Sequence, residues 1–491
     1  MNPLVLPLLP LLGAGIVVLL RARPRVLAPA AVATLVATIA LAATAAIARP
    51  SVVIGWGPAI ELTLAVSGFG RVMVVLVPAI AAPIVAYAAA TEPDGRPRLL
   101  AFLLAFTAAM LLLVIAGDFV SLLIAWELVG ATSWALIGHG WRDRENVESG
   151  TQAFLTTRLG DLGLYAAAGA TLAGSGGFAF DGVAAAASPW REIIAGGIIL
   201  AASAKSAQVP FSPWLFAAMA GPTPVSALLH SATLVAAGAY LLIRVSPALV
   251  LVDWFLPAIA AIGMVTAIAG GVVALTQSHA KRVLAASTSA QYGLMFIAVG
   301  AGSTAAAGAQ LVTHAAFKSL LFLAAGVAIH AVGTPDLRAM RLGRLLPGIA
   351  VVAAVGGLSL AGVPPLGGAW SKEAILGAAA DASVWLALGV LAASFLTVIY
   401  AGRFVILAFG PGSVQRSIRR PGTVEGAALV VLAAVTVALS ALWIPAAAPT
   451  VERLTAGALA AGATWEAVAT LGVIFAGALA LAVAVRRGRL A

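Results

Sequence analysis

Apolar stretches of roughly 20 residues, the length of helix that crosses the hydrocarbon core of a bilayer, recur from one end of this chain to the other. Of its 491 residues, 62% are hydrophobic and 9% are charged. A soluble protein of this size could not cover so much apolar surface. Cysteine is absent, which excludes disulfides, iron–sulfur ligation and thiolate zinc sites. The sequence therefore predicts an all-α polytopic membrane protein.

The hydropathy pattern predicts about fifteen spans joined mostly by short loops. Their approximate starts are residues 3, 26, 72, 98, 119, 150, 193, 225, 254, 283, 304, 347, 383, 423 and 463. Residues 50–70 alternate and contain glycines, which indicates a β-hairpin on one surface. We expect N-terminal spans with this hairpin, two five-helix repeats and C-terminal spans, at residues 1–97, 98–250, 251–410 and 411–491.

Two segments are too long and too interrupted by proline to be ordinary spans. Residues 193–221 contain Lys205, and residues 347–378 contain Lys372. Proline inside a span frees backbone carbonyls, which is tolerated where they face protein or a water-filled cavity. The two breaks lie about five spans apart, and broken helices at matching positions of two halves are typical of inverted repeats. We therefore predict two inverted five-helix repeats, each with a broken helix.

Basic residues are distributed unequally between alternate loops. One set of loops, which includes Arg416, contains 18 basic residues, whereas the other set, which includes Arg453, contains 5. Loops rich in arginine and lysine remain in the cytoplasm. We therefore expect a multi-pass protein of the cell's inner (plasma) membrane, with its N-terminus outside and its C-terminus cytoplasmic. This placement also accounts for the net charge of +10 without a nucleic-acid partner.

Lysine is rare in this chain, yet it is concentrated where charge is most costly. Only four of the 28 basic residues are lysines, and Lys205, Lys318 and Lys372 lie in apolar spans. Arginine is effectively always protonated, whereas a buried lysine can shift its pKa and release a proton. The use of lysine at these positions therefore predicts sites that alternate between a charged and a neutral form.

Other ionisable side chains extend this series into neighbouring spans. The predicted proton-carrying residues are Glu127, Lys205, His230, His314, Lys318 and Lys372, supported by Arg158, Asp161 and Glu373. Such a row, bridged by water, could transfer protons along the membrane plane. Arg158 and Asp161 are three residues apart on one helix face and could pair. Glu127 is expected to approach Lys205 and to hold it protonated.

Simpler roles remain open for part of this series. Glu127 and Lys205 could be a structural ion pair that fixes two helices. His230 could simply hydrogen-bond a carbonyl freed by the proline kink before it. Arg158 with Asp161 is equally compatible with an architectural role.

Motifs for other chemistries are missing from the sequence. It contains no dinucleotide-binding, phosphate-binding or zinc-protease motif. His139 and His279 are near loop ends and are expected at the surface, and the histidines show no facing pair for haem. We therefore expect no cofactor in this chain, and any redox chemistry must take place in a partner.

Several stretches resemble the antiporter-like membrane subunits of respiratory complex I. They are WELVG from Trp126, TTRLGDLG from Thr156, AKSAQVP from Ala204, AMAGPTPVSALLHSATLVAAGAYLL from Ala218, VTHAAFKSLLFLAAG from Val312 and AGVPPLGGAWSKEAIL from Ala361. The resemblance covers residues 110–375 and is of the subunit L, or chain 5, type of NADH-quinone oxidoreductase. The same fold module serves Mrp-type sodium/proton antiporters, membrane hydrogenases and the membrane subunits of inorganic-carbon uptake complexes.

The resemblance implies a proton path driven by quinone reduction elsewhere in a complex. It assigns to that path Glu127, Lys205, His230, His314, Lys318 and Lys372. Family members often have a second histidine one turn before His314, where this chain has Gln310, which we expect to support the path. The implied partners are other membrane subunits, which would hold the NADH and quinone chemistry, and the implied cargo is protons or sodium. A typical subunit L continues into a long lateral helix, so a sequence that stops at Ala491 favours a compact or differently partnered relative.

Overall fold

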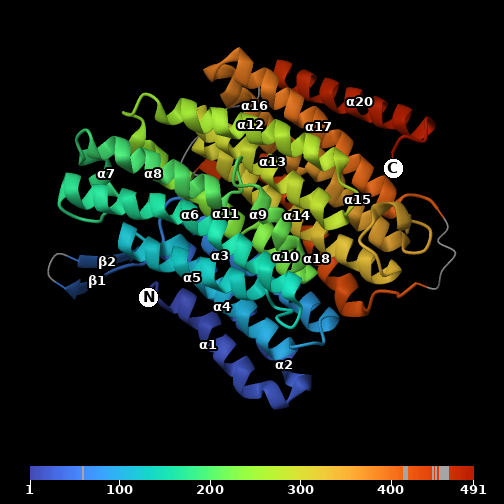
Figure 1. Cartoon of the computed structure of the whole chain (residues 1–491), viewed down its shortest axis with the longest axis horizontal. Helices are drawn as coiled ribbons and strands as arrows, with labels where there is room; N and C mark the ends of the chain where they lie inside the picture. Colours follow the sequence, from blue (N-terminus) through green and yellow to red (C-terminus); the bar gives the residue numbers. More distant parts are fainter. Residues whose placement is uncertain (58–59, 413–417, 445–446, 448–450, 453–463, 491) are drawn as a thin grey trace.

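The computed structural model is a bundle of helices with one small sheet (Figure 1). It describes the chain except for residues 58–59, 413–417, 445–446, 448–450, 453–463 and 491. Two of the loop arginines used in the charge pattern, Arg416 and Arg453, lie outside the described residues.

The first helices form one edge of the bundle, and α20 lies at the opposite edge (Figure 1). The helices of the N-terminal third are α1 (Val5–Leu19), η1 (Leu20–Ala22), α2 (Pro24–Ala48), α3 (Gly70–Thr91), α4 (Arg96–Ile115), α5 (Phe119–Ile137) and α6 (Arg144–Ser175). Helix α1 packs on α2 and α4, and α2 packs on α3. Few residues of α1 and α2 are buried, because these two helices present most of their apolar surface outward.

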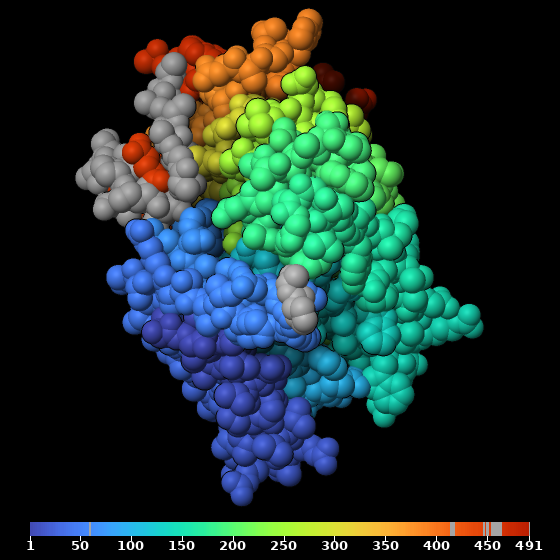
Figure 2. All heavy atoms as spheres, turned by 90° about the vertical axis from the view of Figure 1, so that its left-hand side faces the viewer, coloured from blue at the N-terminus to red at the C-terminus, as the bar shows by residue number. Residues whose placement is uncertain are grey.

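The predicted β-hairpin is confirmed. Strands β1 (Ser51–Gly57) and β2 (Ile60–Ala65) pair antiparallel, and nearly all of β1 is exposed. The backbone N–H of Thr63 in β2 donates to the Asp118 carboxylate at 2.6 Å, which fixes the hairpin to the start of α5. Figure 2 shows the face of the molecule on which the hairpin lies.

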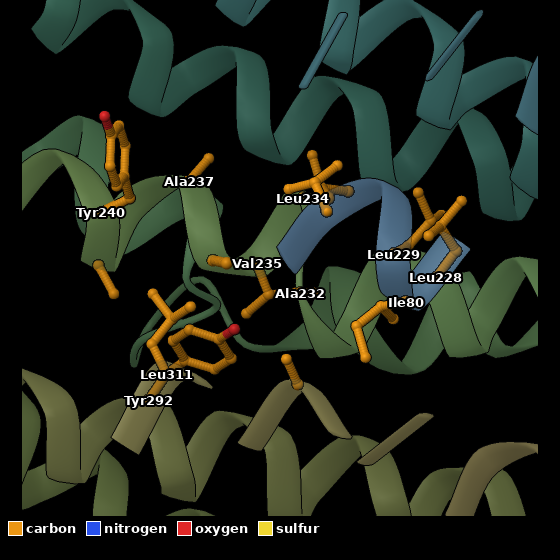
Figure 3. Packing of buried hydrophobic residues seen from close by; sticks show 14 of the residues in the cluster. Ile80, Leu228, Leu229, Ala232, Leu234, Val235, Ala237, Tyr240, Tyr292 and Leu311 are labelled. Carbon is orange, nitrogen blue, oxygen red and sulfur yellow. The ribbon is translucent and has the colours of Figure 1, made fainter. Parts of the chain in front are cut away.

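The middle of the chain contains the first broken segment. Its helices are α7 (Asp181–Ala185), α8 (Trp190–Lys205), α9 (Pro213–Ala217), η2 (Ala218–Ala220), α10 (Thr223–Ser231), α11 (Leu234–Leu249), α12 (Phe255–Thr276) and α13 (Ala280–Gly300). The predicted break is confirmed, because α8 ends at Lys205 and helix resumes only at Pro213. A further interruption separates α10 from α11 at residues 232–233 and was not predicted. Apolar side chains, among them Ala232, gather around it (Figure 3).

The second predicted break is also confirmed. Helix α15 (Pro347–Ala361) ends before the two prolines, and α16 (Gly367–Ala382) begins after them. The other helices of this part are α14 (Thr304–Val332), η3 (Leu337–Ala339), α17 (Val384–Phe409), α18 (Thr423–Ala438), η4 (Leu439–Trp443) and α20 (Thr464–Arg486). Counted from α4, three long helices (α4, α5 and α6) precede the first break, and α7 is only a short surface turn. Three helices (α12, α13 and α14) likewise lie between α11 and the second break. The inverted relation of these two halves, and the boundaries at residues 98, 251 and 411, remain predictions.

Twelve of the described helical segments are long and apolar enough to cross a membrane. Helix α6, the broken α8–α9 segment and the broken α15–α16 segment are the predicted spans that fall outside this set. Helix α6 includes Arg158 and Asp161, whereas α8 and α15 have only 16 and 15 residues. The predicted starts thus match helices along the chain, and the number fifteen itself remains a prediction.

Candidate functional site

Lys205 is the last residue of α8, where the helix breaks, and it is fully buried. Its Nζ lies 3.4 Å from Oδ1 of Asp161 on α6. Asp161 is itself only 2% exposed. The same Oδ1 accepts a hydrogen bond from Trp126 Nε1 on α5 at 2.6 Å. Lys205 Nζ also lies 5.4 Å from the centre of the Trp126 ring, within cation–π range. Three spans therefore converge on one buried ammonium.

Glycines allow this convergence, because α6 and α8 approach more closely than side chains would permit. A Cβ at Gly160 would lie 2.1 Å from the Cβ of Ala204, and a Cβ at Gly163 would lie 2.5 Å from the carbonyl oxygen of Gly197. Small residues at helix contacts are how membrane helices pack without a hydrophobic driving force between them. The close approach places Asp161 opposite Lys205, one residue beyond Ala204.

Two of the predicted pairings are wrong. Glu127 forms an ion pair with Arg158 rather than with Lys205, and Arg158 does not pair with Asp161. Neighbouring residues of a helix point about 100° apart, so Trp126 faces the buried ammonium while Glu127 faces outward. The Glu127 and Arg158 side chains are 26% and 41% exposed, and Tyr165 Oη donates to Glu127 Oε1 at 3.1 Å.

His230 lies fully buried in the last turn of α10, just before the α10–α11 interruption. Its ring is 6.0 Å from the Trp214 ring on one side and 6.0 Å from the Phe322 ring on another. Neither ring nitrogen has a hydrogen-bond partner among the described residues. The simple role of capping a freed carbonyl therefore does not apply to His230. Its two free nitrogens are available to water or to a proton.

His314 connects α14 to the same interruption. Its Nδ1 lies 3.1 Å from the carbonyl oxygen of Ser231, which also accepts from Tyr292 Oη at 3.1 Å. Lys318, one turn along α14, is fully buried, and its Nζ donates to the Leu284 carbonyl at 3.0 Å and to Ser287 Oγ at 2.6 Å. His314 and Lys318, four residues apart on α14, are thus directed toward α10 and α13.

A chain of hydroxyl and amide groups continues from Lys318 toward the second broken helix. Ser287 and Tyr400 interact through their hydroxyls, and Gln291 Nε2 donates to Tyr400 Oη at 2.9 Å. Gln310 Nε2 donates to Gln291 Oε1 at 2.8 Å, and Ser371 Oγ donates to Gln310 Oε1 at 2.5 Å. Ser371 immediately precedes Lys372. Gln310, predicted as a supporting residue, is therefore at the centre of a buried chain that leads from Lys318 to Ser371, the residue before Lys372.

Lys372 lies at the second helix break in the way that Lys205 lies at the first. Its Nζ donates to the carbonyl of Leu360, which is freed where α15 ends. Gly362 has a φ of +82°, and a Cβ there would lie 3.3 Å from Lys372 Cδ. The neighbouring Glu373 is partly exposed, and among the described residues it forms no ion pair with Lys372. Within the described chain, Lys318 and Lys372 are held by neutral acceptors, whereas Lys205 has a carboxylate.

Sequence reasoning missed the residues that connect the lysines: Trp126, Ser287, Gln291, Ser371 and Tyr400. The available signal was their polarity inside apolar spans, because a polar group in a membrane interior needs a partner.

The predicted surface position of His139 is wrong. The residue is only 7% exposed, with Nε2 3.2 Å from the Asp94 carbonyl, and burial lowers the pKa of its imidazole. His279, by contrast, is partly exposed.

The described residues contain no group of three histidine or carboxylate side chains that could hold a metal ion. What the geometry provides is a row of buried ammonium, imidazole, hydroxyl and amide groups across broken membrane helices. This arrangement defines a class of protein, the polytopic carriers and pumps in which ionisable residues inside the membrane mark an ion path.

Comparison with known proteins identifies the family within that class. Residues 116–399 match the family described as NADH:quinone oxidoreductase/Mrp antiporter, transmembrane. The match covers more than half of the chain, so the chain belongs to this family.

Individual relatives come from two kinds of complex. NAD(P)H-quinone oxidoreductase chain 5 of Synechocystis sp. is 37% identical over 72% of this chain and 55% of its own length. NADH-quinone oxidoreductase subunit L of Campylobacter jejuni is 39% identical over 64% of this chain and 54% of its own length. The chain thus spans about half the length of the curated relatives it matches. A chain in the structure of the Mrp complex from Dietzia sp. superposes with a TM-score of 0.87 at 31% identity, over 98% of this chain and 56% of that one.

Proposed function

We propose that this chain is a proton-translocating membrane subunit of an NADH-quinone oxidoreductase-type respiratory complex. Protons would move along the series Glu127, Lys205, His230, His314, Lys318 and Lys372. The observation that supports this most strongly is the buried lysine at each helix break, connected in the second half through Gln310 and its neighbours. Redox cofactors would lie in partner subunits, as would the quinone.

The arrangement suggests a division of roles. Asp161 occupies the position beside Lys205 that Glu127 was expected to take. Glu127 and Arg158, half-exposed on the outer side of α5 and α6, lie where a neighbouring membrane subunit could exchange protons with this chain. Lys318 and Lys372, with neutral acceptors, can be held either as ammonium or as neutral amine, since both forms donate hydrogen bonds to carbonyl and hydroxyl oxygens.

The energy that must be supplied is modest. Moving one proton outward against 100 mV costs about 2.3 kcal/mol. A change in the distance between Lys205 and Asp161 alters a Coulomb attraction of this size or larger, because the local dielectric constant is low. Movement at the first helix break can therefore couple to proton release.

The test distinguishes titration from charge. Lys205→Arg keeps a cation beside Asp161 but removes a group that can release a proton at physiological pH. In inverted membrane vesicles containing the assembled complex, we expect Lys205→Arg to lose most NADH-driven proton uptake. Arg158→Lys, a conservative change on the outer side of the same helix pair, should be milder. Uptake at the unmodified rate in Lys205→Arg would mean that Lys205 is a structural cation.

A second candidate is a subunit of an Mrp-type cation/proton antiporter. It is favoured by the superposition on the Mrp complex chain, which extends over 98% of this chain. In the same vesicles, an antiporter would collapse an imposed proton gradient on addition of sodium, without NADH. A respiratory subunit would require the redox reaction.

We also propose that the N-terminus lies outside and the C-terminus in the cytoplasm. Reporter fusions at Arg142 and Arg338 should then both give cytoplasmic signals. An external signal at either position would break the proposed topology.

A further inference from the structure

A cavity of about 1150 Å³ opens between α1, α4 and the connection from α5 to α6. It shares no residue with the buried lysine series and takes no part in the proposed proton path. The end of α1, the start of α4 and the end of α5 all lie on the face of the bundle opposite the hairpin, because the hairpin joins the other ends of α2 and α3 (Figure 1). The cavity is therefore at one membrane–water boundary.

One half of the cavity is apolar. It is lined by Leu11, Ala14, Gly15, Val18, Ala101, Phe102 and Ala105 from α1 and α4. Leu11 is 50% exposed and Val18 is 46% exposed, so this half is open along the outer side of the bundle. In a membrane, that side faces the acyl chains.

The other half is basic and aromatic. Arg21, Arg98 and Arg142 line it together with Trp141. The guanidinium of Arg142 lies 4.6 Å from the centre of the Trp141 ring, and that of Arg98 lies 6.0 Å from it. One nitrogen of Arg98 donates to the His139 carbonyl at 2.6 Å, which fixes the side chain and leaves its other donors free.

Two acidic residues, Asp94 and Asp143, share this rim, so its formal charge is +1 with a neutral imidazole. The Asp143 carboxylate caps α6 by accepting from the Glu145 backbone N–H at 3.0 Å. It is thus engaged with the helix end, where the dipole already favours an anion. Within the described chain, none of these three arginines forms an ion pair with a carboxylate.

A buried polar atom at the base of this half is a second, independent observation. His139 lines the cavity and is more than nine-tenths buried, and its Nδ1 has no partner among the described residues. A buried imidazole nitrogen without a partner is costly unless something completes it. A phosphate oxygen or glycerol hydroxyl would supply the missing hydrogen bond if a side-chain rotation exposed this covered nitrogen to the cavity.

We propose that this cavity binds one anionic phospholipid, with its phosphate at Arg21, Arg98 and Arg142 and its acyl chains along α1 and α4. The guanidinium forks match phosphate oxygens in pairs, and Trp141 lies at the depth where aromatic residues meet headgroups. The volume exceeds the roughly 300–1,000 Å³ of ordinary small-ligand pockets. A free phosphate would use only the basic half, whereas a lipid uses both halves.

The first test compares two double variants with the same loss of charge. The full chain, purified and returned to nanodiscs of equal phosphatidylglycerol and phosphatidylcholine, is analysed by native mass spectrometry for retained lipid. Arg21→Gln with Arg142→Gln should lower retained phosphatidylglycerol at least tenfold. Arg23→Gln with Arg25→Gln, exposed on the same face but outside the cavity, should change it less than twofold.

The second test fills the acyl half. A Cβ at Gly15 meets no atom within 4 Å, so Gly15→Phe can extend into the cavity without disturbing the fold. It should displace the retained lipid, whereas Gly169→Phe, at an equally open position on α6, should not. Equal retention of both lipids by the unmodified chain, or equal losses in the two double variants, would overturn the proposal. Equal retention of the two lipids is also the result expected if the groove is the binding site for an apolar helix of a neighbouring subunit.

Discussion

The reassigned ion pairs allow a sharp test, because Asp161 on α6 and Glu127 on α5 differ in burial and in partner. Asp161→Asn removes the charge opposite Lys205 but keeps an oxygen that can accept from Trp126 Nε1. Glu127→Gln removes the charge opposite Arg158 and likewise keeps an oxygen for Tyr165. Both substitutions preserve size and one hydrogen bond, so their difference isolates the buried pair from the exposed one.

The expected difference in stability follows from burial. Removing one partner of a buried pair leaves an uncompensated charge and costs about 3–5 kcal/mol. An exposed pair contributes about 0–1 kcal/mol. Because Lys205 is 0% exposed and the Arg158 side chain is 41% exposed, the pairs fall at these two limits. We therefore expect Asp161→Asn to lower the free energy of unfolding by at least about 2 kcal/mol more than Glu127→Gln.

The measurement is reversible unfolding of the purified chain by titration with a denaturing detergent, followed by proton uptake in vesicles. Asp161→Asn should be the less stable variant and should lose most proton uptake. Glu127→Gln should retain stability within about 1 kcal/mol. If Glu127→Gln is as destabilised as Asp161→Asn, then Glu127 is the working partner of Lys205 and the pairing described above is wrong.

Two further predictions follow from the buried network and from the loop histidine. Tyr400→Phe removes the hydroxyl between Ser287 and Gln291 and should lower proton uptake severalfold, whereas Tyr240→Phe, which loses a buried hydroxyl bonded to a backbone carbonyl, should not. Equal effects of the two would exclude a relay through Tyr400. Burial lowers the pKa of His139, so the unfolded chain binds a proton that the folded chain refuses, and stability should fall as pH drops below about 6.5. His139→Gln should reduce that dependence, measured as melting temperature between pH 7.5 and pH 5. If the melting temperature of His139→Gln depends on pH as that of the unmodified chain does, groups other than His139 cause the dependence.

The sequence predicted those parts of the fold that local chemistry determines. Proline next to a lysine inside an apolar stretch located both helix breaks, and alternation with glycines located the hairpin. The interruption after His230 was missed because residues 232–233 are alanine and threonine, which do not break helices by themselves. Apolar side chains from other parts of the chain surround it (Figure 3), and such packing is not visible in a local pattern.

The site was predictable by residue type but not by pairing. The cost of charge in a membrane singles out lysine, histidine and carboxylate whichever way they point. Whether Glu127 or its neighbour Trp126 faces Lys205 depends on the rotation of α5 about its axis, which residue type alone does not determine. A rotation of about 100° per residue separates the two outcomes. Hydrogen-bonding residues such as Gln291 and Tyr400 cost less to bury and therefore attract less notice in a sequence.

The two halves of the series differ in how a proton could cross them. Between Lys318 and Ser371, the residue before Lys372, the described residues offer consecutive hydroxyl and amide groups. Between Lys205 and His230 they offer Trp214, whose Nε1 donates to the Ala204 carbonyl at 2.8 Å and whose ring lies 6.0 Å from that of His230. The described residues form no side-chain relay across this gap, so a proton must wait for water to enter it.

Trp214 is therefore expected to limit passive proton flow through the first half. Trp214→Leu would leave a space bordered by the freed Ala204 carbonyl and by the His230 ring, whose nitrogens have no other partner among the described residues. Such a polar space holds water, unlike an apolar cavity, which stays dry. In proteoliposomes with an imposed pH gradient and no substrate, Trp214→Leu should increase the proton leak severalfold, while Trp134→Leu, at a 46% exposed position, should not. A leak that stays at the unmodified rate, in a variant that remains folded, would show that water already crosses this gap or that protons take another route.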